Sequence, residues 1–97
     1  AYDALARLPA VALLADDHLA YEVDRAATDE PGLAEMTVRA LDLLAAHAGE
    51  AGFFLMVEGS RIDHAGHGND PVGHLHDILA YDRAVAEGQA ALNGAAK

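Results

Sequence analysis

Two residues with metal-binding side chains, Asp63 and His67, stand four positions apart in a chain of 97 residues. On a helical turn this spacing places both side chains on one face, close enough to bind a single ion. A carboxylate oxygen and an imidazole nitrogen suit zinc, which takes about three protein ligands at a catalytic site, so the pair is one ligand short. Glu58 offers a further oxygen ligand that would equally suit magnesium. A solvated loop that binds no metal remains the alternative for such a pair.

The element that would position these groups is the apolar run 53–57, bounded by Gly52 and Gly59. It is too short for an ordinary helix and predicts a strand buried on both faces. Ligands of open α/β sheets gather beyond the carboxyl ends of the strands. We therefore expect the site at four residues just beyond this strand, Glu58, Asp63, His64 and His67.

Helices are predicted on both sides of this strand. After Pro31, which suits a first helical turn, apolar residues recur at helical spacing from Leu33 to Leu44, and Gly49 is a natural stop. A second helix is expected over residues 72–89. The order helix, strand, helix indicates α/β architecture. The run 11–14 could be a second strand or a buried turn.

The remaining histidines have simpler interpretations. His74 and His76 lie two apart, hence on different faces of the second helix, and are expected on its solvated surface, with one of them near the site. His47 lies near the end of the first helix, where an imidazolium favours the helix dipole. His18 comes after two aspartates in what is expected to be a polar turn, with a ligand cluster as the alternative.

The composition limits the partners of the chain. Its formal net charge is -10 and its Lys and Arg residues do not cluster, which argues against binding nucleic acid or an anionic membrane surface. The absence of cysteine excludes disulfides and thiolate ligands in this segment. No apolar run approaches the roughly 18 residues of a membrane span. Because the chain begins at Ala1 and supplies only one convincing strand, we expect an incomplete piece of a larger domain.

Beyond these patterns, residues 53–67, FFLMVEGSRIDHAGH, closely resemble the metal-ligand segment of alkaline phosphatases. The segments NDP at 69–71 and LAYDRA at 79–84 resemble the residues downstream of that segment in the family, and YEVDR at 21–25 and PGLAEMT at 31–37 resemble its fungal-type branch. The resemblance covers nearly the whole chain. It implies that residues 1–97 are part of one domain, a three-layer α/β/α sandwich with a mainly parallel central sheet.

The same resemblance implies a phosphomonoesterase with two zinc ions and one magnesium ion, usually a homodimer and periplasmic or secreted. By matching position, Glu58 would bind magnesium, Asp63 and His67 would bind the first zinc, and His64 would reach the phosphate through water. The serine nucleophile, the phosphate-binding arginine and the other zinc ligands of the family lie outside this segment, so the isolated 97 residues are expected to be inactive.

Two alternatives stay open. The first is a stand-alone metal-binding or interaction module that keeps the ligand loop without catalysis. The second is another phosphotransfer enzyme of the same superfamily, such as a phosphomutase or sulfatase, which would differ in its nucleophile and second-zinc ligands.

Overall fold

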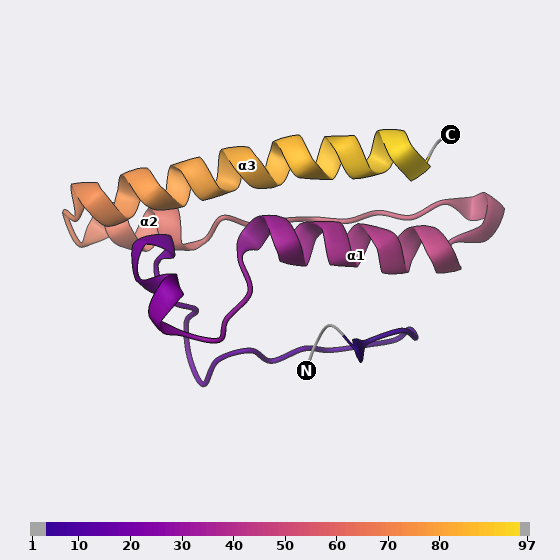
Figure 1. Ribbon diagram of the computed structural model, residues 1–97, viewed down its shortest axis with the longest axis horizontal. Coiled ribbons are helices and arrows are strands. Elements are labelled where there is room, and N and C mark those ends of the chain that lie inside the picture. The colour runs from indigo at the N-terminus through magenta and orange to yellow at the C-terminus, as the bar shows by residue number, and fades with distance from the viewer. Residues whose placement is uncertain (1–3, 96–97) are drawn as a thin grey trace.

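The computed structural model describes residues 4–95, and residues 1–3 and 96–97 lie outside the described part (Figure 1). The element order is η2 (Glu22–Ala27), α1 (Leu33–His47), η3 (Gly49–Ala51), α2 (Arg61–His67) and α3 (Pro71–Ala95). Helices α1 and α3 lie side by side, and α2 and η2 both pack against α3. Among the described residues, no helix is both long and apolar enough to cross a membrane.

Helix α1 confirms the amphipathic helix predicted from the sequence. Its buried inner face consists of Ala34, Thr37 and Leu41, and the Thr37 hydroxyl donates to the carbonyl oxygen of Leu33 at 2.8 Å. The helix begins at Leu33 with Gly32 as its N-cap, so Pro31 precedes the first turn instead of lying in it.

Helix α3 is longer than the predicted range 72–89, and no proline interrupts it between Pro71 and Ala95. Ala84 is 1% exposed where α3 meets the rest of the chain. Gly88 is buried, and a Cβ at this position would lie 3.3 Å from Thr37 Cγ2 and 3.7 Å from Leu41 Cδ1. Small residues on α3 therefore allow α1 to approach closely.

The predicted α/β architecture is wrong for this structure, because residues 4–95 contain no strand and no sheet. The run 53–57 does avoid helix, and its trace passes alongside α1 and α3 (Figure 1). A strand needs a hydrogen-bonded neighbour, and no other described segment pairs with this run. It is not buried on both faces either, since Phe54 and Met56 are 86% and 76% exposed.

The possible second strand at 11–14 is also wrong. This run has no regular secondary structure, and Val11 and Leu13 are exposed. A three-layer sandwich with a parallel central sheet is therefore not what the described residues form. The run 53–57 still ends at Glu58 and leads through Gly59 and Ser60 directly into α2.

Candidate functional site

Helix α2 provides the helical turn on which the pairing of Asp63 and His67 depends. His67 Nε2 lies 3.4 Å from Asp63 Oδ1. Both side chains face solvent, with 74% of Asp63 and 81% of His67 exposed. An exposed pair of this kind contributes little to folding, and both side chains are open to solvent.

The end of α2 is fixed by a Schellman motif. Asn69 has a left-handed φ of 51°, its N–H donates to the Gly66 carbonyl at 3.1 Å, and the N–H of Asp70 donates to the Ala65 carbonyl at 3.0 Å. These two bonds satisfy carbonyl groups that a helix end would otherwise leave without partners. The turn that carries Asp63 and His67 is therefore ended by a defined cap.

The same corner starts α3. The Asp70 carboxylate accepts a hydrogen bond from the Gly73 N–H at 3.0 Å, which is the geometry of an N-cap. Pro71 occupies the first helical position, where its missing N–H removes no hydrogen bond. Three residues, 68–70, thus end one helix and cap the next, and they fix α2 against the beginning of α3.

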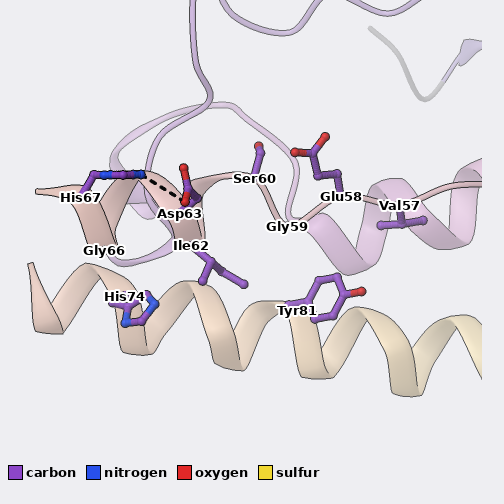
Figure 2. A pocket seen from close by; sticks show the side chains of 10 residues that line it. All are labelled: Val57, Glu58, Gly59, Ser60, Ile62, Asp63, Gly66, His67, His74 and Tyr81. Carbon is purple, nitrogen blue, oxygen red and sulfur yellow. Dashed lines mark ion pairs between the residues drawn. The ribbon is translucent and has the colours of Figure 1, made fainter.

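A hollow of about 670 Å³ lies over α2 and the preceding loop. Figure 2 shows that the side chains of Glu58, Ser60, Asp63 and His67 point to the same side, away from α3. The other lining residues include Ile62 and two residues of α3, His74 and Tyr81. The oxygen and nitrogen donors therefore face the same open surface. Helix α3 lies on the other side of α2 and of the preceding loop.

The loop that joins Glu58 to α2 is held by contact with α3. A Cβ on Gly59 would lie 2.8 Å from Cδ2 of Tyr81 and 3.2 Å from Cδ1 of Ile62. Carbon atoms in contact normally stay about 3.5–4.0 Å apart. Only glycine lets the backbone next to Glu58 pass this close to the tyrosine ring.

The structure places His64 apart from the other three predicted site residues, since it is not among the residues that line the hollow. Its ring contacts the ring of His18, with centroids 4.4 Å apart, and its Nδ1 lies 3.0 Å from Nη1 of Arg61. The guanidinium of Arg61 also lies over the ring of Tyr21, 3.8 Å from its centroid. The sequence interpretation missed this cluster, because its two halves are far apart in the chain and no local spacing indicates it.

The remaining histidines mostly agree with the interpretation from sequence. His74 is the one of the pair His74 and His76 that lines the hollow, and His76 is exposed on α3. His47 ends α1, where its Nδ1 donates to the Leu43 carbonyl at 2.7 Å. His18 lies in an irregular loop, with its Nε2 3.9 Å from an oxygen of Asp17.

Charged groups on η2 and α3 connect the N-terminal segment to α3. Glu22 accepts hydrogen bonds from Nε and Nη2 of Arg25 at 2.8 and 3.0 Å, and these bonds hold the pKa of Glu22 below its usual value. Asp77 accepts a hydrogen bond from the Glu22 N–H at 3.2 Å, and burial raises the pKa of this aspartate. Helix η2 is thereby attached to α3 by a carboxylate.

The donor chemistry fits a divalent ion in part. Asp63 and His67 together offer one oxygen and one nitrogen to the same space, and these are ligand types that zinc binds. Within residues 4–95, no three His, Asp or Glu side chains come together closely enough to hold a metal ion by themselves. The pair could thus serve as two ligands of an ion whose coordination is completed by other groups.

Comparison with known proteins gives a consistent result. The family model described as "Alkaline phosphatase" matches residues 3–96. The chain is 45% identical over 82 residues to "Alkaline phosphatase" of Schizosaccharomyces pombe, which covers 81% of this chain and 15% of that protein. It is 47% identical over 81 residues to "Repressible alkaline phosphatase" of Saccharomyces cerevisiae, covering 79% of this chain and 14% of the yeast protein.

A bacterial relative is also similar. "Streptomycin-6-phosphate phosphatase" of Streptomyces griseus is 54% identical over 61 residues, which is 58% of this chain and 14% of that protein. The chain spans only about 15% of the length of the relatives it matches first. No solved structure matches it.

Proposed function

Because this chain belongs to the alkaline phosphatase family, we propose that the whole protein hydrolyses phosphomonoesters with the help of bound metal ions. The observation that carries this proposal is the pairing of Asp63 and His67 on one face of α2, at 3.4 Å and open to solvent. Family membership supports the reaction class, and the geometry supports the proposal that these two side chains act as metal ligands.

We propose that Asp63 and His67 hold zinc and that Glu58 holds magnesium. Asp63 offers a carboxylate oxygen and His67 offers Nε2, and both already face the same open space. Glu58 lines the same hollow with an exposed carboxylate. Bound metal ions supply charge that polarises a phosphoryl oxygen and activates the attacking oxygen.

The chain's own residues have the task of holding these donors in place. The Schellman motif at Asn69 ends the turn that carries Asp63 and His67, and the Asp70 cap fixes that turn to α3. His64 is proposed to contact the phosphate through water. With two donors on α2 and one on the preceding loop, the isolated 97 residues are expected to bind zinc weakly and to show no turnover.

Dimerisation, and a location in the periplasm or outside the cell, rest on the family alone and are proposals of the same kind. Light scattering and cell fractionation of the whole protein test them.

The metal assignment is tested by replacing each ligand in the whole protein. Asp63→Asn and His67→Asn should each lower phosphatase activity at least about a hundredfold, because a metal contributes several kcal/mol to a phosphoryl-transfer transition state and each 1.36 kcal/mol is tenfold in rate. Metal analysis should show less zinc per protein in both variants.

Matched controls are available on α1. Asp42→Asn and His47→Asn make the same chemical changes at exposed positions that do not line the hollow. Both controls should retain activity and zinc. Full activity together with normal zinc content in Asp63→Asn and His67→Asn would refute the assignment.

A further inference from the structure

The side chain of Arg61 connects α2 to the N-terminal segment. It is the first residue of α2, and its guanidinium lies 3.8 Å from the centroid of the Tyr21 ring. Its Nη1 lies 3.0 Å from Nδ1 of His64, and the ring of His64 lies against the ring of His18 at a tilt of 52°. Arg61 is half-buried, so these contacts define its orientation.

The contact with Arg61 determines which ring nitrogen of His64 carries hydrogen. A guanidinium has five N–H donors, accepts no hydrogen bond and stays protonated in proteins. At 3.0 Å from Nη1, Nδ1 of His64 must therefore be the acceptor. The ring hydrogen is then on Nε2.

We propose that Arg61 is a positioning residue that fixes His64 in the tautomer with N–H at Nε2. This inference rests on the proposed function, in which His64 meets an anionic phosphate. With hydrogen at Nε2 the ring offers a donor to a phosphate oxygen or to the water bound to it. The opposite tautomer would present a lone pair there, which an anion disfavours.

The surroundings of Arg61 argue against a direct role in binding the phosphate. Arg61 lines a small hollow together with four carboxylates, those of Glu22, Glu30, Glu58 and Asp77, and with one other cation, Arg25. The four carboxylates outnumber the two arginines, so the net negative charge of this hollow opposes the approach of an anion to Arg61. Its Nη1 and the face of its guanidinium are already engaged by His64 and Tyr21. Arg61 is therefore placed to act through His64.

The tautomer can be measured without any substitution at Arg61. The whole, metal-loaded protein is labelled with ¹⁵N-histidine, and the resonances of His64 are assigned from the spectrum of His64→Gln. The ¹⁵N chemical shifts of His64 are measured at one fixed alkaline pH. They are expected to show that Nδ1 carries no hydrogen and that Nε2 carries one. Hydrogen at Nδ1 would overturn the inference.

A double-mutant cycle tests whether Arg61 acts through His64. Binding of inorganic phosphate to the whole protein is measured by calorimetry for Arg61→Met, His64→Gln and the double variant. Each single change should weaken binding about tenfold, the effect of losing one charge-assisted hydrogen bond. The double variant should bind no more weakly than His64→Gln alone. Arg61→Lys, which keeps a donor, should lose less than Arg61→Met.

The controls separate this inference from its premise. Arg83→Met removes an arginine that pairs with Glu87 on the exposed side of α3, and it should leave phosphate binding unchanged. Losses that add in the double variant would mean that Arg61 binds the anion itself, and they would overturn the inference. If the protein binds no phosphate at all, the proposed function fails, while the nitrogen shifts still decide the tautomer.

Discussion

Replacing Gly59 with alanine would insert a methyl group where the loop after Glu58 passes Tyr81. The new Cβ would lie 2.8 Å from Cδ2 and 3.3 Å from Cγ of the tyrosine, and 3.2 Å from Cδ1 of Ile62. Taking about 3.5 Å as the shortest comfortable carbon contact, the overlap with Cδ2 is about 0.7 Å. The isoleucine methyl is the end of a flexible chain and can move. The tyrosine ring is rigid, and two of its atoms are too close.

An overlap of this kind typically costs about 1–3 kcal/mol, because neighbouring groups must leave their preferred positions. Gly59→Ala should therefore lower the melting temperature of the whole protein. The decisive measurement is the same substitution in two backgrounds. In Tyr81→Ala the ring atoms are gone, and the further cost of Gly59→Ala should fall below about 1 kcal/mol. In Tyr81→Phe the ring remains, so the full cost should remain.

Gly94→Ala is the matched control. No atom lies within 4 Å of its would-be Cβ, and the residue is exposed in α3. Alanine has the higher helix propensity, so this change should leave stability unchanged or raise it by up to about 1 kcal/mol. An equal penalty for Gly59→Ala in the Tyr81→Ala and wild-type backgrounds would refute the argument from close approach.

Three further predictions concern the corner between α2 and α3 and the ion pair within η2. Asp70→Ala should destabilise the protein by about 1 kcal/mol in thermal unfolding through loss of its cap on Gly73, and Asp70→Asn should retain most of that stability. Asn69→Gly should be neutral or stabilising and Asn69→Ala destabilising by about 1 kcal/mol, because φ at Asn69 is left-handed; equal melting temperatures for the two variants would contradict this. The hydrogen bonds from Arg25 lower the pKa of Glu22 in the folded state. They therefore stabilise the fold when the pH is above the pKa of this carboxyl in the unfolded state. This contribution is lost as the pH falls through the pKa of the folded state. Glu22→Gln should therefore show a shallower loss of stability on acidification below about pH 4.5, measured by melting temperature against pH, and a curve parallel to the wild type would count against the pair.

The helices were predictable because their signals are local. The apolar stripe and the stop at Gly49 indicate α1. For α2, the spacing of Asp63 and His67 brings the two side chains together on condition that the segment is helical, and the structure meets that condition. The length of α3 was underestimated. Gly88 lies near the predicted end of that helix. In the structure it lies within the helix and faces Thr37 and Leu41 of α1.

The strand was mispredicted because strand formation is not a local property. The run 53–57 has the composition of a buried strand, yet its backbone groups need a partner segment that residues 4–95 do not supply. Helix η2 was missed although its signal is local. Glu22 and Arg25 stand three apart, a spacing that stabilises a helical turn, and this signal could have indicated it.

Of the candidate site, the pairing of Asp63 with His67 was predictable from the sequence. The i, i+4 rule brings Asp63 and His67 together once residues 61–67 form a helical turn. The contact of His64 with Arg61 follows the i, i+3 spacing on α2. Its contact with His18 depends on how the N-terminal loop folds back over α2, which no sequence spacing encodes.

The short corner at 68–70 has a mechanical consequence. At 25 residues, α3 is about 37 Å long, and Asp70 joins it to α2 without a flexible linker. The two helices therefore hold a fixed orientation at this corner, next to the turn that carries Asp63 and His67. A displacement of α3 at this corner would therefore move Asp63 and His67 together, while their separation of 3.4 Å stays set by the helical turn of α2.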